Sequence, residues 1–203
     1  MLAITLLLAY LLGSIPSGWL AGWWCKGIDL RQSGSGSTGA TNVLRSVGKG
    51  AALVVLLADV LKGSVAVLLT RQLSAGPWLE VVAGLLALAG HTWPVWLGFR
   101  GGKAVATGLG MLLGLVPAVG FACLGVFAAL LGLFRIVSLA SLAAALALPL
   151  LMAVAAPATP AYLSLALLTA ALVVWRHRAN MLRLLAGTEP RLGGSGGSED
   201  HSG

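Results

Sequence analysis

Long apolar segments alternate with short polar loops along most of the chain. A straight helix needs roughly 20 apolar residues to cross a bilayer, and all but one of the segments approach that length. The exception, residues 103–116, is expected to be thinned, tilted or partly re-entrant. The pattern therefore predicts an all-α polytopic membrane protein, a bundle of seven transmembrane helices at residues 2–24, 51–70, 78–99, 103–116, 117–134, 137–155 and 160–176.

The composition makes a bilayer, rather than water, the expected solvent of this bundle. The chain has 203 residues, of which 58% are hydrophobic and 9% are charged, whereas a soluble globular domain carries roughly 25% charged residues. The first apolar segment has no basic region before it and no clear cleavage site, so we expect a retained span rather than a signal peptide. We expect a single domain over residues 1–192 and a flexible Gly/Ser-rich tail over residues 193–203.

The basic residues fall mainly on one side of the predicted bundle. The formal net charge is +7, but these residues flank apolar spans, so we expect membrane lipid and no nucleic acid as a partner. With seven spans, the first, third and fifth loops and the C-terminal tail share one side. The positive-inside rule then places the N-terminus outside and the C-terminus in the cytoplasm. The basic residues on that side are Lys26, Arg31, Arg45, Lys49, Arg100, Lys103, Arg135, Arg176, Arg178, Arg183 and Arg191.

The first of three polar clusters, residues 29–45, follows the first apolar segment. Its glycines allow sharp turns that expose backbone N–H groups, and such nests bind anions. Arg45 adds a fixed charge whose forked geometry suits phosphate. A flexible interhelical loop is the alternative, but a linker has no need of the polar side chains beside the glycines. The candidate anion ligands are Ser35, Gly36, Thr41, Asn42 and Arg45.

The second cluster, residues 90–107, joins the third and fourth apolar segments. His91 ends an apolar run, and the run Arg100-Gly-Gly-Lys103 places two cations and two permissive glycines just before a helix. A helix N-terminus with a lysine beside it attracts anions. The alternative is that both cations only follow the positive-inside rule and that His91 is an interfacial histidine. The glycines between the cations favour a site formed by His91, Gly102 and Lys103.

The third cluster, residues 176–189, follows the last apolar segment. His177 and Asn180 lie three residues apart and share a helix face. A basic stop to the last span is the alternative interpretation. Within the second apolar segment, Asp59 and Lys62 also lie three residues apart, and ionisable groups at such depth face the interior and pair. We therefore expect an internal ion pair that positions this helix.

Sequence patterns typical of other kinds of site are either in the wrong context or missing. The run Gly34-x-Gly36-x-x-Gly39 matches the dinucleotide fingerprint, but it lies between two membrane spans and not after a strand. Cys25 and Cys123 have no C-x-x-C or metal-ligand spacing. The His/Cys/Asp/Glu residues likewise form no group with ligand spacing. We therefore expect neither a metal nor a cofactor.

The three clusters together resemble the acyl-phosphate-dependent glycerol-3-phosphate acyltransferases of bacterial membranes. The resemblance runs from about residue 2 to residue 192. It departs from the family at Ser37-Thr38, where Asn followed by Pro or Thr is expected, and at Arg100, which replaces the commoner Lys. The residues that carry it are Gly13-Ser-Ile-Pro-Ser-Gly18, Gly34-Ser-Gly36, Gly39-Ala-Thr-Asn42, Gly90-His91, Phe99-Arg-Gly-Gly-Lys103, Val105-Ala-Thr107, His177, Asn180 and Gly187-Thr-Glu189.

The resemblance implies a concrete reaction. An acyl group passes from acyl phosphate to the 1-hydroxyl of glycerol 3-phosphate, giving 1-acyl-glycerol 3-phosphate (lysophosphatidic acid) and phosphate, at the cytoplasmic face of the bacterial inner membrane. It leaves open a soluble acyl-phosphate-producing enzyme as a partner. It implies catalytic roles for Ser35, His91 and Lys103, and binding of the phosphates and the acyl carbonyl by Ser35, Gly36, Thr41, Asn42, Arg45, Gly102, Lys103, Ser141, His177 and Asn180. Ser138 is an alternative to Ser141.

The proton acceptor for the attacking hydroxyl has three candidates, namely His91, His177 and a phosphate oxygen of a substrate. A covalent acyl-Ser35 intermediate is a weaker alternative, because no acid–base–nucleophile triad is legible. The chief rival function is transport of a phosphorylated solute, which predicts a polar site near the midplane and paired halves. The clusters lie instead at one predicted face, and the chain has no convincing internal repeat, so the sequence favours an enzyme.

Overall fold

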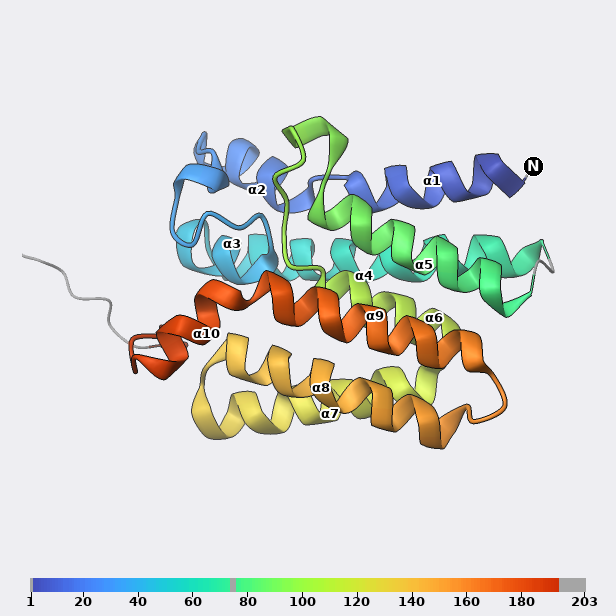
Figure 1. Cartoon of the computed structure of the whole chain (residues 1–203). Helices are drawn as coiled ribbons and strands as arrows, with labels where there is room; N and C mark the ends of the chain where they lie inside the picture. The colour runs from blue at the N-terminus through green and yellow to red at the C-terminus, as the bar shows by residue number, and fades with distance from the viewer. Residues whose placement is uncertain (1, 74–75, 194–203) are drawn as a thin grey trace, which may run out of the picture.

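The computed structural model describes residues 2–73 and 76–193, and its regular structure in those ranges is helical (Figure 1). Residues 194–203, nearly all of the predicted flexible tail, lie outside the described residues. The elements are α1 (Leu2–Ser14), α2 (Ser17–Lys26), η1 (Leu30–Gln32), α3 (Ala40–Ser46), α4 (Lys49–Gln72), α5 (Pro77–Thr92), η2 (Val95–Leu97), α6 (Val105–Leu115), α7 (Pro117–Phe134), α8 (Val137–Ala155), α9 (Pro160–Arg176) and α10 (Arg178–Leu185).

Each of the seven predicted apolar segments contains at least one of these helices. Five stretches in the described ranges are long and apolar enough to cross a bilayer, namely Leu2–Lys26, Lys49–Gln72, Pro77–Leu97, Pro117–Phe134 and Val137–Ala155. A sixth is obtained if α9 and α10, bent by 60° at their junction, form one span. The remaining predicted span is α6, with 11 residues. The chain is therefore an all-α polytopic membrane protein with five to six candidate spans.

The first apolar segment is two helices, not the single helix that we predicted. α1 ends at Ser14 and α2 begins at Ser17, because Pro16 has no backbone N–H to continue the hydrogen-bonding ladder. The break leaves the carbonyl oxygen of Ile15 free of the helix, and the Nζ of Lys62 donates a hydrogen bond to it at 3.2 Å. This hydrogen bond thus links the first apolar segment to α4.

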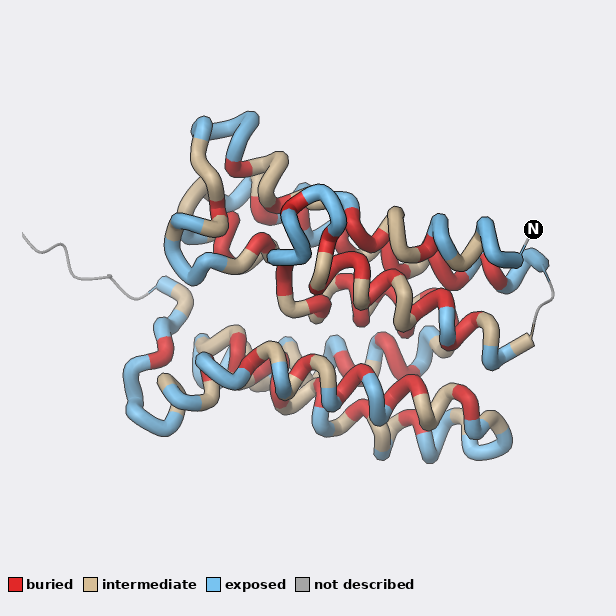
Figure 2. Tube along the Cα trace, turned by 45° about the horizontal axis from the view of Figure 1, so that its top comes forward, coloured by how far each residue is buried: buried red, intermediate tan, exposed pale blue. Residues whose placement is uncertain are grey.

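Close helix packing centres on α4, α5 and α6. α4 lies along α6, α1 along α5, and α7 and α8 form a neighbouring pair that α9 joins (Figure 1). Glycines permit the closest approach, since a Cβ on Gly110 would lie 1.8 Å from the carbonyl oxygen of Val60 and small residues let membrane helices pack tightly. Figure 2 shows buried positions along the inward faces of the helices. Met111 and Leu165 are fully buried members of the core.

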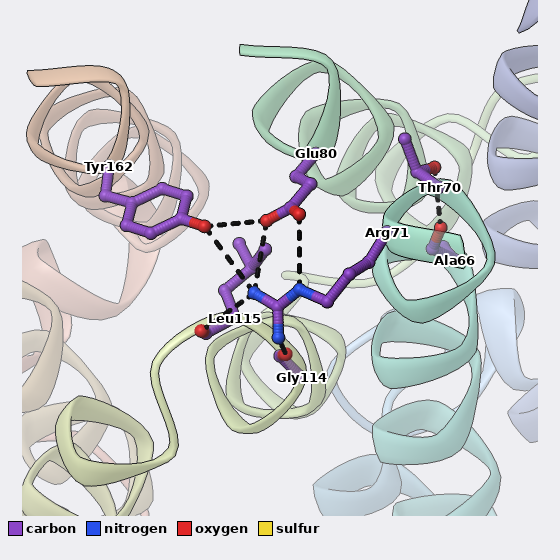
Figure 3. A network of polar contacts seen from close by, with 7 residues as sticks. All are labelled: Ala66, Thr70, Arg71, Glu80, Gly114, Leu115 and Tyr162. Atoms are coloured by element: carbon purple, nitrogen blue, oxygen red, sulfur yellow. Dashed lines mark hydrogen bonds and ion pairs between the residues drawn. The ribbon is translucent and has the colours of Figure 1, made fainter. Parts of the chain in front are cut away.

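A polar network ties four helices together at the end of α4 (Figure 3). The guanidinium of Arg71 donates to both carboxylate oxygens of Glu80, at 3.2 and 3.1 Å. It also donates to the carbonyl oxygens of Gly114 at 2.9 Å and Leu115 at 3.1 Å. Tyr162 donates to Glu80 at 2.6 Å. Because the last carbonyls of a helix lack partners within it, Arg71 caps the C-terminal end of the short helix α6.

Candidate active site

A single cavity of about 420 Å³ collects the polar clusters predicted from the sequence. It lies among the loop before α3, the start of α6, the start of α8 and the α9–α10 junction. Of the predicted site residues, Gly36 and Gly102 do not line it. Those that do are Ser35, Thr41, Asn42, Arg45, His91, Lys103, Ser141, His177 and Asn180. Groups far apart in the sequence therefore meet in one site.

The loop before α3 is shaped by the side chain of Asn42, which is buried. Its amide nitrogen donates to the carbonyl oxygens of Ser33 and Ser37, both at 2.9 Å, and to that of Leu30 at 3.2 Å. Its amide oxygen accepts from the backbone N–H of Ser35 at 3.0 Å. Asn42, a predicted anion ligand, therefore makes these hydrogen bonds to its own loop, and this loop places Ser35 at the cavity.

Gly34 shows why this loop needs glycine. Its φ of +58° is a conformation that side-chain-bearing residues rarely adopt. A Cβ at Gly34 would also lie 2.2 Å from the amide oxygen of Asn42. Both constraints couple Gly34 to the loop-shaping amide, so the glycine pattern of the first cluster has a geometric origin.

Lys103 reaches the cavity from the loop before α6 and meets the third cluster there. Its Nζ donates to the Oδ1 of Asn180 at 2.5 Å, and the Nδ2 of Asn180 donates to Glu189 at 2.6 Å. Glu189 also accepts from Ser138 at 2.7 Å and from Arg183 at 2.7 Å. The chain Lys103–Asn180–Glu189 thus joins α6, α8 and α10. Ser138 was predicted only as an alternative to Ser141, and Glu189 was quoted in the motif Gly187-Thr-Glu189 without a role in the site.

The electrostatics around Lys103 suit an anion. Burial lowers the pKa of Lys103 to about 8; Glu189 opposes this shift, while Arg183, Arg176 and Arg45 add to it. Below that pH the lysine is a partly desolvated cation among other cations. Burial alone would raise the pKa of Glu189, but hydrogen bonds from Asn180, Ser138 and Arg183 outweigh it and lower that pKa. The carboxylate stays charged and fixes Asn180 beside Lys103.

Arg45 supplies a second cation at the cavity wall. It lies near the end of α3, and within the part of the chain that the structure describes its guanidinium donates a single long hydrogen bond, 3.5 Å to the carbonyl oxygen of Pro190. Among residues 2–73 and 76–193 it has no carboxylate partner within ion-pair distance. A guanidinium whose donors are largely unused is well suited to bind a phosphate in two-pronged fashion.

His177 stands at the junction where α9 bends into α10. Its Nδ1 lies 2.8 Å from the carbonyl oxygen of Val173. A carbonyl oxygen only accepts, so Nδ1 carries the hydrogen, and a neutral ring then has its lone pair on Nε2. The side chain is buried and lines the cavity. His177 can therefore accept a proton or, once protonated, donate a hydrogen bond to an anion.

His91 lies at the end of α5 and packs against the loop that carries Lys103. Its backbone carbonyl accepts from the N–H of Gly102 at 3.0 Å. Its ring lies against the same residue, since a Cβ at Gly102 would be 2.1 Å from Nε2. Nδ1 lies 3.7 Å from the Oδ1 of Asp59. Gly102, a predicted ligand, thus serves the close approach of the loop to His91.

Most of the remaining cavity wall is apolar and lies between helices. Leu56 and Leu57 on α4 and Leu124 on α7 line it and are also exposed on the outer surface. The cavity is therefore continuous with the lipid-facing side of the bundle. Its apolar wall also includes Leu109, Leu112, Cys123, Phe127, Ala144, Ala145, Leu148 and Val173.

Sequence comparisons agree with this arrangement. A family model described as glycerol-3-phosphate acyltransferase matches residues 3–187. The chain is 62% identical over 195 residues to the glycerol-3-phosphate acyltransferase of Synechococcus sp. (strain CC9902), covering 96% of this chain and 97% of that one. It is also 62% identical over 190 residues to the protein of the same description from Parasynechococcus marenigrum (strain WH8102), covering 94% and 89%.

Solved structures give the same result. The chain superposes with a TM-score of 0.88 on the crystal structure of PlsY (YgiH), an integral membrane glycerol 3-phosphate acyltransferase, in its glycerol 3-phosphate form. The two are 39% identical, and the match covers 95% of this chain and 96% of that one. The lysophosphatidic acid form of that protein matches with a TM-score of 0.87. The chain therefore belongs to the glycerol-3-phosphate acyltransferase family of integral membrane proteins.

Proposed function

We propose that this enzyme transfers an acyl group from acyl phosphate to the 1-hydroxyl of glycerol 3-phosphate, releasing lysophosphatidic acid and phosphate. One observation carries the proposal: a single cavity has a cationic end, at Arg45 and Lys103, and an apolar end open to lipid. A phosphorylated polar acceptor and a lipid product fit those two ends. Crystal forms of PlsY, the structural relative, contain glycerol 3-phosphate and lysophosphatidic acid, which supports the acceptor and the product.

The cationic end binds the phosphates in this proposal. Two phosphates held side by side repel strongly where the dielectric constant is low, so the site needs several fixed donors. Arg45 and Lys103 supply charge, His177 supplies an imidazole, and Ser35 and Thr41 supply hydroxyls. Lys103 also stabilises the oxyanion that forms at the acyl carbon and the phosphate that departs. Asn180 acts by holding Lys103, and Ser141 lies within the same wall.

The acyl chain lies in the apolar end, between α4, α6, α7 and α8. Burying each methylene group contributes about 0.8 kcal/mol, so a long chain contributes substantially to donor binding. The exposed leucines at the rim, Leu57 and Leu124, let the chain pass to the bilayer without crossing water. The lipid product leaves by the same route.

We assign the hydroxyl proton to a phosphate oxygen of the donor. The ring nitrogens of His91 face Asp59 and Gly102, whereas His177 bonds Val173 through Nδ1 and keeps Nε2 available as the alternative base. The 1-hydroxyl oxygen of glycerol 3-phosphate forms the new C–O bond to the carbonyl carbon, and the bond between that carbon and the phosphate oxygen of the donor breaks. The departing phosphate takes the hydroxyl proton. Since the donor is already activated, positioning supplies much of the rate. Ser35 then binds substrate and forms no acyl-enzyme.

The orientation in the membrane follows from the charge distribution. We infer seven membrane helices in one domain over residues 1–192, with α6 as a short one, the N-terminus outside and the C-terminus in the cytoplasm. The loops with Arg45 and Lys103 and the segment from Arg176 to Arg191 are then cytoplasmic, as the positive-inside rule requires. The active site opens to the cytoplasm of a bacterial inner membrane, where a soluble enzyme could supply the acyl phosphate.

The assay that tests the donor uses purified protein in lipid nanodiscs with glycerol 3-phosphate. Palmitoyl phosphate, palmitoyl-CoA and palmitoyl-acyl carrier protein are offered in parallel, and phosphate release and lysophosphatidic acid are followed. We expect product from the acyl phosphate alone. Product from the thioesters only would overturn the donor assignment. Transport of glycerol 3-phosphate into liposomes, without product from any donor, would favour the rival transport function.

A second assay tests the proton acceptor. His177→Gln keeps a hydrogen-bonding amide near the position of Nε2 but cannot act as a base at neutral pH. If a donor phosphate takes the proton, the loss of kcat stays within roughly tenfold. A general base contributes typically 10²–10⁴-fold, so a loss in that range would instead assign the proton to His177.

A further inference from the structure

A second buried polar cluster lies behind the loop that carries Lys103, and two of its members, Asp59 and His91, also line the active-site cavity. We call Ser17, Asp59, Lys62 and His91 the Asp59 cluster. The Oδ1 of Asp59 accepts from Ser17 at 2.5 Å and pairs with the Nζ of Lys62 at 2.8 Å, and Nδ1 of His91 lies 3.7 Å away. Asp59 is 1% exposed and Lys62 6%. The cluster joins three separate elements: the α1–α2 break, α4 and α5.

Stability alone does not account for such a pair. Removing each charge from water costs several kcal/mol, and apolar replacements of a buried pair are often neutral or stabilising. The Arg71–Glu80 pair at the far end of α4 differs, because Arg71 remains 41% exposed and caps α6. A fully buried pair beside an active site therefore requires another explanation, and its neighbours suggest one.

On one side, the cluster supports the turn that leads to Lys103. The backbone of α5 accepts from this turn twice: Gly102 donates to His91 at 3.0 Å and Gly101 donates to Thr92 at 3.1 Å. The His91 ring occupies the space where a side chain on Gly102 would lie. Rotation or displacement of this ring would move the turn, and Lys103 follows it directly.

On the other side, the cluster supports the loop of the first polar cluster. Lys62 holds the carbonyl oxygen of Ile15 at 3.2 Å, and Ser17 is the first residue of α2. The next residue, Gly18, packs against the carbonyl oxygen of Thr38, where a Cβ would lie at 1.8 Å. Thr38 immediately precedes the residues that lead into α3. Both phosphate-facing loops thus rest on elements that Asp59 and Lys62 hold together.

We propose that Asp59 and Lys62 are positioning residues for acyl transfer: they fix the His91 ring and the α1–α2 break, and so set the spacing between Lys103 and the Ser35 loop. Neither residue reacts. The proposal deepens the proposed function and rests on it. It also gives His91 a supporting role in place of the predicted catalytic one, since its ring nitrogens face Asp59 and Gly102.

The test compares Asp59→Asn with Glu80→Gln, in nanodiscs, by steady-state kinetics with palmitoyl phosphate and glycerol 3-phosphate. Asp59→Asn removes the carboxylate charge of an ion pair within α4, and Glu80→Gln removes that of an ion pair between α4 and α5. Glu80 lies at the end of the bundle away from the cavity. A misplacement of about 1 Å costs on the order of 10²-fold in rate. For Asp59→Asn we expect kcat/KM to fall roughly 10- to 100-fold, with the KM of at least one substrate raised several-fold.

The KM separates positioning from folding. Loss of folded protein lowers the apparent kcat and leaves KM unchanged, so Glu80→Gln should keep both KM values whatever its melting temperature. Equal KM values in Asp59→Asn and the wild type would overturn the proposal. The same conclusion would follow if both variants lost kcat/KM to the same extent.

Two further variants provide the same test if Asp59→Asn does not fold. The double variant Asp59→Asn/Lys62→Met removes both charges and leaves no unpaired ion. Ser17→Ala keeps both charges and removes only the 2.5 Å hydrogen bond. We expect raised KM in each, with the smaller change in Ser17→Ala. Wild-type KM in either variant, when folded, would count against the proposal.

A binding measurement tests the positioning role independently of which acyl donor the enzyme uses. If the wild type makes no product from palmitoyl phosphate, the proposed function fails, but the cluster can still be tested. Inorganic phosphate and glycerol 3-phosphate should raise the melting temperature of the wild type and of Glu80→Gln. In Asp59→Asn we expect that ligand-induced shift to be lost, and an unchanged shift would overturn the positioning role.

Discussion

Lys103 and Asn180 are 77 positions apart in the chain, yet the Nζ of one lies 2.5 Å from the Oδ1 of the other. The contact closes the active site, since it joins the loop before α6 to α10. It also makes Lys103 dependent on Glu189, which holds the amide of Asn180. The cation that the reaction needs is therefore positioned by the last described helix as well as by its own loop.

Acyl transfer should weaken in alkaline solution as Lys103 loses its proton. Burial lowers its pKa from 10.5 to about 8, so the cation is present below pH 8 and lost above it. The phosphate groups of the substrates titrate near pH 6, well below this range. We expect kcat/KM to fall as pH rises from 7 to 10, and Lys103→Arg to move that fall to higher pH. An identical alkaline limb in Lys103→Arg would exclude Lys103 as its origin.

Glu189→Gln should lower both stability and turnover. The carboxylate accepts from Asn180, Ser138 and Arg183, and a hydrogen bond to a charged group contributes about 1.5–3 kcal/mol. We expect a lower melting temperature at pH 7 and a several-fold lower kcat/KM. Because the pKa of Glu189 is lowered in the fold from its ordinary value of 4.5, its contribution is present near neutral pH and is lost as pH falls below 4.5 and through the lowered pKa of the folded protein. The variant should lose less stability than the wild type on acidification, and an equal loss would contradict this role.

Gly110→Ala should disturb the site through helix packing alone. The added Cβ would lie 1.8 Å from the carbonyl oxygen of Val60, so α6 must move away from α4. We expect a lower melting temperature and at least a tenfold lower kcat/KM, because α6 begins two residues after Lys103. Gly125→Ala is the matched control: it also lies within a helix and meets nothing within 4 Å. Ala is favoured over Gly in helices by about 1 kcal/mol, so this control should be neutral or slightly stabilising.

Ala145→Phe should shorten the acyl chains that the enzyme accepts. Ala145 lines the cavity on α8, one turn beyond Ser141, and a larger side chain there fills the apolar end. We expect kcat/KM for palmitoyl phosphate to fall at least tenfold relative to decanoyl phosphate. Leu146→Phe serves as the control, because Leu146 is 65% exposed on the outer surface of the same helix. A parallel change in both variants would argue against a chain-length effect.

Much of the site was predictable from local chemistry. Ser35, Thr41, Arg45 and Lys103 were predicted from their residue types and neighbouring glycines, and His177 from the helix face that it shares with Asn180. The family resemblance assigned binding roles to these residues, and all five line the cavity. The ion pair between Asp59 and Lys62 was predicted from their spacing on a helix and is confirmed at 2.8 Å. Such predictions succeed because an ionisable group in an apolar span has few alternatives to pairing.

Other features depend on contacts that local patterns do not encode. The role of Asn42 rests on backbone carbonyls of its own folded loop. That of Glu189 rests on helix α8, which contributes Ser138. The break at Pro16 was visible in principle, because proline interrupts a helix, but the surrounding apolar residues suggested continuity. The count of seven spans stays a prediction, since α6 has only 11 residues.

The shortness of α6 has an electrical consequence. At 11 residues α6 is about 16 Å long, roughly half the hydrocarbon thickness of a bilayer. It runs beside the second half of α4 up to the Arg71 cap, which places Lys103 near the middle of α4. If the site opens to the cytoplasm as proposed, a phosphate bound there would lie part of the way across the transmembrane voltage, which acts on each charge with about 2.3 kcal/mol per 100 mV over its full span. An inside-negative potential would then favour the movement of the anionic substrates from the cytoplasm into the site.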